Sequence, residues 1–141
     1  MEFFATADIQ VRAAELQKNL CVGNLPQWCA SIERVLENQG DRGSIYCIWG
    51  EFRVHRELIR DGVRFSLPTC PNGLQWTVSV ENSAPAGKAS VHCTINRREH
   101  APDFIESVER FMADWKSGLE GSPRHAGGQA PKPCECMPWF G

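Results

Sequence analysis

The sulfur-containing residues with the most chemistry to offer lie near the end of the sequence. Cys134 and Cys136 are separated by one residue, and Met137 follows them directly. Two thiolates supply half of a tetrahedral zinc site, and a thioether beside them also suits soft Cu(I). We therefore predict a zinc or Cu(I) site at these three residues, completed by Cys70, by His125 or by a partner protein.

The same pair of thiols offers redox chemistry as an alternative. A disulfide between Cys134 and Cys136 would close a ring across a single residue. Such a ring is strained, and strained, exposed disulfides exchange readily with other thiols. The spacing therefore also predicts a relay of sulfur or reducing equivalents, and the sequence does not decide between a relay and a metal site.

Two aromatic residues accompany these thiols. Trp139 and Phe140 come after residues 120–133, which are rich in Gly and Pro and contain few apolar side chains to bury. A flexible linker of this length has a typical end-to-end distance of about 20 Å. Burial of each aromatic side chain is worth roughly 1.5–3 kcal/mol. We predict that the tail, residues 134–141, docks reversibly on its own domain or on a partner protein.

A second candidate surface is a row of polar side chains in the middle of the sequence. His92 stands between Val91 and Cys93, so it faces away from the apolar side of its predicted strand. In another predicted strand, His55 lies two residues after Arg53 and on the same face. An uncovered face of an antiparallel sheet is normally polar, so the first interpretation is a solvated surface. The second is a binding surface for a polar ligand or a partner protein, formed by His92, His55 and Arg53.

The remaining cysteines are predicted to be structural. Cys47 and Cys93 fall on the apolar side of their strands, and free cysteines are among the most buried residues. Cys21 and Cys29 flank a turn between predicted helices and are expected to pack in the core or at its boundary. Cys70 lies in a predicted hairpin loop, where its thiol is expected to be partly exposed.

Composition bounds the class of protein. A chain of 141 residues, 42% of them hydrophobic, is long enough for one domain with a substantial core. Fifteen basic and seventeen acidic residues give a net charge of -2, so no global field attracts nucleic acid or an anionic membrane. The first residues show no secretory pattern, and no apolar stretch approaches the roughly 20 residues of a membrane span. We expect a soluble cytoplasmic protein that binds neither nucleic acid nor a membrane.

Hydrophobic periodicity predicts a two-layer α+β fold. Apolar residues at helical spacing predict two N-terminal helices, a helical hairpin, over residues 6–20 and 24–40. Alternating apolar residues over 45–95 then predict an antiparallel meander of four to five strands, with a bulge or bend at Gly50 where the alternation changes parity. A final helix is expected from Pro102 to Leu119.

These elements suggest a domain over residues 1–119, followed by the linker 120–133 and the tail 134–141. The leading hypothesis is an accessory protein that docks on a partner, such as a metalloenzyme or redox complex, and relays a metal, sulfur or electrons through the tail. The alternative is a non-catalytic binding or regulatory module whose aromatic tail is a docking peptide. The third hypothesis is an enzyme with its site at His92 and His55. It ranks last because the sequence contains no common catalytic motif.

Overall fold

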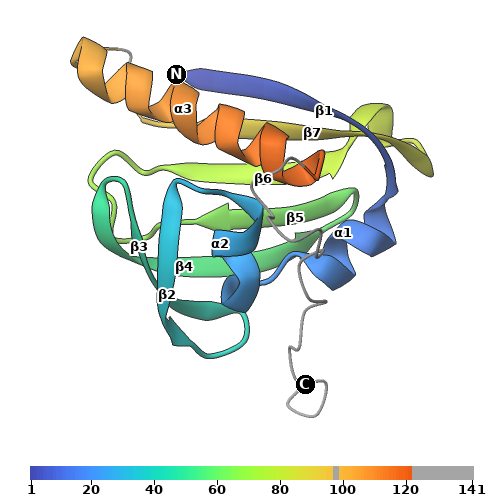
Figure 1. Cartoon of the computed structure of the whole chain (residues 1–141), viewed down its shortest axis with the longest axis horizontal. Coiled ribbons are helices and arrows are strands. Elements are labelled where there is room, and N and C mark those ends of the chain that lie inside the picture. Colours follow the sequence, from blue (N-terminus) through green and yellow to red (C-terminus); the bar gives the residue numbers. More distant parts are fainter. Residues whose placement is uncertain (97–98, 122–141) are drawn as a thin grey trace.

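Seven antiparallel strands form one sheet in the computed structural model, which describes residues 1–96 and 99–121 (Figure 1). The strands lie side by side in the order β1-β7-β6-β5-β4-β3-β2, so β2 to β7 form a meander and β1 joins it beside β7. Their bounds are β1 Glu2–Arg12, β2 Ile32–Asn38, β3 Arg42–Cys47, β4 Gly50–Ile59, β5 Gly62–Ser66, β6 Gln75–Val80 and β7 Ala86–Thr94.

Helices cover one face of this sheet, which we call the inner face. The long helix α3 lies across it, and the shorter α1 and α2 lie between β1 and β2 in the chain (Figure 1). The bounds of the helices are α1 Ala13–Asn19, α2 Leu25–Trp28, α3 Pro102–Leu119 and the 3-10 turns η1 Val22–Asn24 and η2 Glu81–Ser83. None of the helices within the described ranges is long and apolar enough to cross a membrane.

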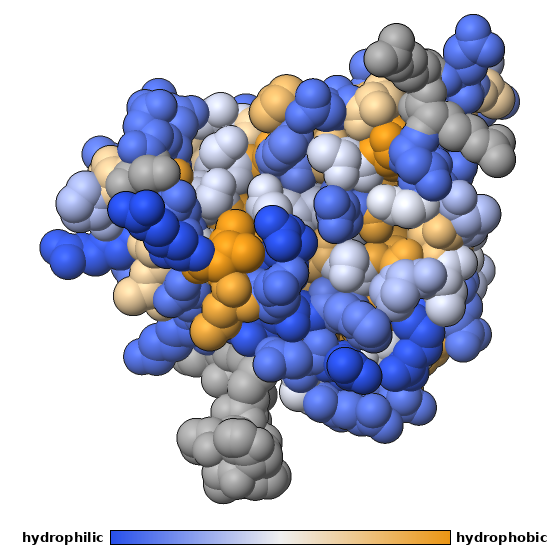
Figure 2. Space-filling model, turned by 180° about the vertical axis from the view of Figure 1, so that it is seen from behind, coloured by the Kyte–Doolittle hydropathy of each residue, from blue (hydrophilic) through white to orange (hydrophobic). Residues whose placement is uncertain are grey.

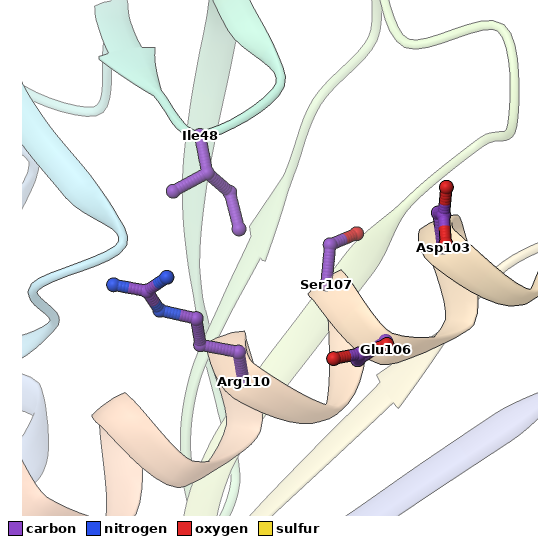
Figure 3. A pocket seen from close by; sticks show the side chains of 5 residues that line it. All are labelled: Ile48, Asp103, Glu106, Ser107 and Arg110. Atoms are coloured by element: carbon purple, nitrogen blue, oxygen red, sulfur yellow. The ribbon is translucent and has the colours of Figure 1, made fainter.

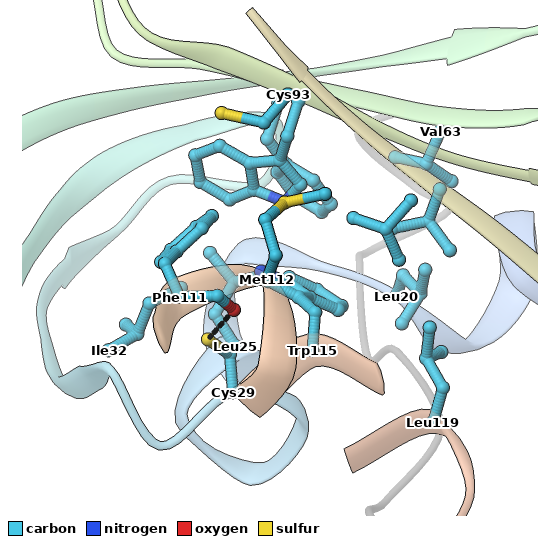
Figure 4. Close-up of a cluster of buried hydrophobic side chains, with 14 of the residues drawn as sticks. Leu20, Leu25, Cys29, Ile32, Val63, Cys93, Phe111, Met112, Trp115 and Leu119 are labelled. Atoms are coloured by element: carbon cyan, nitrogen blue, oxygen red, sulfur yellow. Dashed lines mark hydrogen bonds between the residues drawn. The ribbon is translucent and has the colours of Figure 1, made fainter. Parts of the chain in front are cut away.

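The core fills the space between the inner face and α3 (Figure 4). Trp76 of β6 packs edge-on against Phe111 of α3, with ring centroids 5.0 Å apart, and also stacks on Phe65 at 5.3 Å. Trp115 is 0% exposed and lies within 6.3 Å of Phe65. Each fully buried side chain of this size contributes roughly 1.5–3 kcal/mol through the hydrophobic effect, so this aromatic cluster holds α3 on the sheet.

Two close contacts fix the smaller helices. Arg56 points from β4 to the inner side, where its guanidinium donates hydrogen bonds to the backbone carbonyls of Gln17 and Leu20 at the end of α1. Gly118 lies so close to α2 that a Cβ at this position would be 1.7 Å from the carbonyl oxygen of Trp28. The first contact ties α1 to the sheet, and the second allows α3 and α2 to touch through their backbones.

The predicted N-terminal helical hairpin is wrong. Residues from Glu2 to Arg12 form strand β1, and only Ala13–Asn19 forms a regular helix within the first predicted helix. The inner side of β1 carries Phe3, Ala5, Ala7, Ile9 and Val11, a regular period of two. Ile9 fits this period of two and also the helical spacing of the apolar residues in α1. The sequence pattern at Ile9 is therefore compatible with both a strand and a helix.

The second predicted helix, residues 24–40, is also wrong, because only Leu25–Trp28 forms an α-helix and Ile32–Asn38 forms β2. The pairing of β2 with β3 shifts twice, between Ile32 and Arg34 and between Val35 and Glu37. Each shift breaks the alternation of a strand, so the apolar residues of β2 fall at a spacing that resembles a helix. Such irregularities are common at the edge of a sheet, where β2 lies.

The expected count of four to five strands is wrong for a further reason. Residues Arg42–Cys47 and Gly50–Ile59 are not one bulged strand but two strands, β3 and β4, that pair with each other around a turn at Ile48 and Trp49. Gly50 has φ +114°, a backbone conformation that glycine adopts readily. The change of parity at Gly50 therefore marks a hairpin.

The final helix, by contrast, is confirmed over Pro102–Leu119.

Candidate functional site

The face of the sheet opposite the described helices, which we call the outer face, carries most of the polar residues singled out in the sequence. Seen from behind the view of Figure 1, the molecule is dominated by hydrophilic groups (Figure 2). His92 of β7 pairs across the sheet with Thr77 of β6, and His55 of β4 pairs with Ser66 of β5. Because β6 and β5 lie between them, the two histidines are about three strand spacings, roughly 14 Å, apart. They share a face but do not form one site.

Two of these predicted binding residues, His92 and Arg53, have side-chain contacts within the sheet. The Nε2 atom of His92 lies 2.7 Å from a carboxylate oxygen of Glu2, and its ring is stacked on Phe4 with centroids 4.4 Å apart. The guanidinium of Arg53 donates hydrogen bonds of 2.9 Å to Glu37 and to Ser44. These cross-strand pairs stabilise the outer face, and they engage Nε2 of His92 and one terminal nitrogen of Arg53.

The buried cysteines on the inner face are chemically protected. Burial raises the pKa of the Cys93 thiol to about 12, and the nearby thiol of Cys70 adds to this rise. Burial likewise raises the pKa of Cys47, against the opposing effect of hydrogen bonds from the backbone. Cys70 itself is half-buried in the loop between β5 and β6. Cys93 and the adjacent His92 lie on opposite faces, so they do not form a nucleophile and base pair.

The predicted metal and relay residues of the tail, which are His125, Cys134, Cys136 and Met137, lie outside the described residues, as do Trp139 and Phe140. Within residues 1–96 and 99–121, no three His, Cys, Asp or Glu side chains are grouped so that they could hold a metal ion. Cys70 is therefore the one member of the predicted metal set with a described position, and the rest of that set stays a prediction.

A pocket of about 360 Å³ lies between the β3–β4 turn and the outward side of α3 (Figure 3). Ile48 forms one wall from the turn, and the opposite wall comes from Asp103, Glu106, Ser107 and Arg110. Figure 3 shows the side chain of Arg110 directed from the helix toward Ile48. The three charged side chains are exposed and form no ion pair with any other described residue. The pocket thus offers an apolar contact and both signs of charge.

The wall of this pocket is held by a contact between the turn and α3. The indole N–H of Trp49 donates a 2.8 Å hydrogen bond to the Ser107 hydroxyl, which donates in turn to the carbonyl of Phe104. The ring of Trp49 also lies 5.1 Å from that of Phe111. Trp49 is therefore anchored by both a hydrogen bond and aromatic packing, so the residue next to Ile48 in the turn is fixed against the helix.

A second set of bonds fixes the other end of the turn. The backbone N–H of Ile48 donates to the carbonyl of Ser31 over 2.9 Å, and the Ser31 hydroxyl donates a 2.6 Å hydrogen bond to Asp114 of α3. Ser31 is 1% exposed, so this link is shielded from water. The turn and helix therefore form one rigid frame around the pocket.

Local sequence patterns do not predict this pocket. Asp103 and Glu106 fall in the first two turns of the predicted final helix, where acidic residues suit the helix dipole, and Ile48 falls within the predicted meander. One signal was available, because two large apolar residues, Ile48 and Trp49, immediately precede a glycine. No local pattern, however, predicts that this turn meets a helix about 60 residues further along the chain.

Comparisons with known proteins show the fold and carry no information on function. No family model matches the chain, and no curated protein does. XoxI from Bacillus cereus has a similar structure, with a TM-score of 0.58 and 13% identity over 84% of this chain and 92% of that one. An uncharacterised protein from Bacillus thuringiensis is similar with a TM-score of 0.56 and 11% identity over 85% of this chain and 96% of its own.

Proposed function

We propose that this chain is a non-catalytic accessory module that binds a partner protein at the pocket between the β3–β4 turn and α3. The observation that carries the proposal is an exposed isoleucine, Ile48, placed beside charged side chains without ion-pair partners among the described residues. Protein contact surfaces combine an apolar centre with a charged rim in this way. Ile48 supplies the apolar centre, and Asp103, Glu106 and Arg110 supply the rim.

Rigidity of the frame supports the same proposal. Binding costs less when the contact groups are already ordered, because fewer side chains and loops must be immobilised. Trp49 and Ser31 hold the turn against α3 by hydrogen bonds of 2.8 and 2.6 Å to the side chains of Ser107 and Asp114. Ile48 is therefore presented in a fixed position although its side chain is 42% exposed.

Site-specific photo-crosslinking tests the proposal. A benzophenone amino acid replaces Ile48 in the full chain, and a matched variant carries it at Leu58, which is 57% exposed and lies near the far end of β4. We expect a discrete cross-linked product from position 48 in cells that express the chain, and none of the same mass from position 58. Equal products at both positions, or no product at position 48, would overturn the proposal.

The tail supplies a second part of the proposal that depends on the sequence alone. We expect Cys134 and Cys136 to relay a metal ion, sulfur or reducing equivalents to the bound partner in a cytoplasmic, reducing compartment. Intact-mass spectrometry of the reduced chain with Zn or Cu(I) tests this, with the double variant Cys134→Ser and Cys136→Ser as control. A bound metal or a reversible disulfide that the double variant lacks is the expected result. If the parent chain forms neither a metal complex nor a reversible disulfide, the relay is refuted. That result would not affect the proposed binding site at Ile48.

A further inference from the structure

The charges of the pocket follow a regular spacing along α3. Asp103, Glu106 and Arg110 stand at positions i, i+3 and i+7, so they share one side of the helix. With a rise of 1.5 Å per residue, Glu106 and Arg110 are about 6 Å apart along the axis, and Asp103 and Arg110 about 10 Å. The acidic end of this row faces the start of the helix and the basic end its middle.

The row is poised for a partner because its own charges do not neutralise one another. Glu106 and Arg110 stand at i and i+4, a spacing that often gives an ion pair, yet no ion pair joins them in the structure. Arg110 turns instead toward Ile48 across the pocket (Figure 3). An anionic group near Ile48 would therefore meet a guanidinium, and a cationic group further toward Asp103 would meet two carboxylates.

An extended peptide matches this arrangement. In a strand, residues i and i+2 point to the same side about 6.7 Å apart, and residue i+1 points to the opposite side. A segment that runs along α3 in the pocket would direct its first and third side chains toward the helix and its middle one toward Ile48. The spacing of about 6 Å between Glu106 and Arg110 suits one basic and one acidic side chain of such a segment.

We infer that the partner segment is an extended stretch with a basic residue and an acidic residue two positions apart and an apolar residue between them. This inference rests on the proposed function and names the chemistry that the same site selects. The basic side chain pairs with Glu106 and Asp103, the acidic one pairs with Arg110, and the apolar one packs on Ile48. A segment that places its acidic side chain at Glu106 and its basic side chain at Arg110 would bring like charges together, so the site rejects it.

Nuclear magnetic resonance titration with short peptides tests the inference. The probes are acetylated and amidated pentapeptides, Gly-Lys-Val-Glu-Gly and Gly-Glu-Val-Lys-Gly, with Gly-Gln-Val-Gln-Gly as the neutral control. We expect one of the charged peptides to bind about fivefold more tightly than the other two at low salt, with shifts at the amides of Ile48 and Arg110. We expect this preference to shrink as salt screens the charges.

A charge exchange in the protein makes the test independent of chain direction. In the double variant Glu106→Lys and Arg110→Glu, the preference between the two charged peptides should invert. Equal binding of all three peptides, equal binding of the two charged peptides, or a preference that the double variant keeps, would overturn the inference. If cross-linking at position 48 succeeds while the peptides show no preference, the pocket binds a protein of other chemistry. If cross-linking fails as well, the proposed function itself falls.

Discussion

The two sides of α3 differ sharply in burial and in charge. The inner side presents Val108, Phe111 and Trp115, each at most 1% exposed, to a core of packed rings. The outer side presents Glu106 and Arg110, both exposed, to an open pocket. The inner side of α3 therefore stabilises the fold, and the outer side belongs to the proposed binding site. Substitutions on the inner side should lower the free energy of unfolding, and those on the outer side should weaken partner binding.

Removing the largest inner side chain should have the greatest effect on stability. Replacement Trp115→Ala deletes a ring that is 0% exposed and leaves a cavity beside Phe65. We expect the free energy of unfolding to fall by about 3–5 kcal/mol, as for other buried aromatic residues. Urea denaturation measures this loss, and a loss below that of an average surface substitution would mean that α3 does not pack as described.

The close approach of α3 to α2 makes a sharper prediction because two effects have opposite signs. In a solvent-exposed helix, Gly→Ala is stabilising by roughly 1 kcal/mol. At Gly118 the new Cβ would lie 1.7 Å from the carbonyl oxygen of Trp28, a backbone atom that cannot move aside easily. We therefore expect Gly118→Ala to be destabilising by about 1–3 kcal/mol. The neighbouring Ser117→Ala serves as control and should be nearly neutral in the same denaturation experiment.

The buried thiol of Cys93 should make stability depend on alkaline pH. Its pKa is about 12 in the folded chain and near the usual 9.0 once unfolded, so between these values the unfolded state binds fewer protons. Its contribution is complete below pH 9 and is lost as pH rises. We expect the wild type to lose about 1.4 kcal/mol per pH unit relative to Cys93→Ala above pH 9. The free energy of unfolding of both proteins is measured by urea denaturation from pH 8 to 11. If the two curves are parallel, the thiol is accessible to solvent.

Loss of the hydrogen bond between Trp49 of the β3–β4 turn and Ser107 of α3 should have a smaller effect on stability. Trp49→Phe keeps most of the aromatic packing but removes the hydrogen bond to Ser107. We expect a loss of about 1 kcal/mol, typical of a single hydrogen bond. Ser107→Ala should cost a similar amount, and the double variant little more than either one. Additive losses in thermal or chemical denaturation would indicate that the two residues act independently.

Substitutions on the outer side should be almost without effect on folding. Glu106→Ala and Arg110→Ala remove exposed side chains that form no ion pair among the described residues. We expect the free energy of unfolding to stay within about 0.5 kcal/mol of the wild type. A larger loss for either variant would mean that this side of α3 contributes to the fold, and the distinction between the two sides would fail.

The sequence predicted α3 and the later strands of the meander because their periods are uninterrupted. Phe111 and Trp115 recur at helical spacing, and Trp76 and Val78 alternate without a break. Prediction failed where two periods overlap, as at Ile9 in β1, and where register shifts disturb the alternation in β2. Both errors lie in the edge strands. β1 pairs with β7, which is far away in the chain, and β2 pairs with the next strand, β3, in a register that shifts twice.

The candidate site could not be predicted for a related reason. Its two walls come from a turn at Ile48 and a helix that begins at Pro102, and only the tertiary fold brings them together. The parity change at Gly50 predicts a bulge or bend, whereas the structure has a hairpin there, and it is this hairpin that presents Ile48. The placement of His92 and Cys93 on opposite faces, in contrast, follows from alternation alone and agrees with the structure.

Cross-linking from position 48 in the Arg110→Glu variant tests the separation of stability from recognition most directly. The benzophenone remains at the same place in the pocket, and only the charge that faces it changes sign. We predict that the cross-linked product falls several-fold while the free energy of unfolding stays within about 0.5 kcal/mol of the parent. An unchanged yield of the product, or a yield that falls only together with stability, would contradict the account.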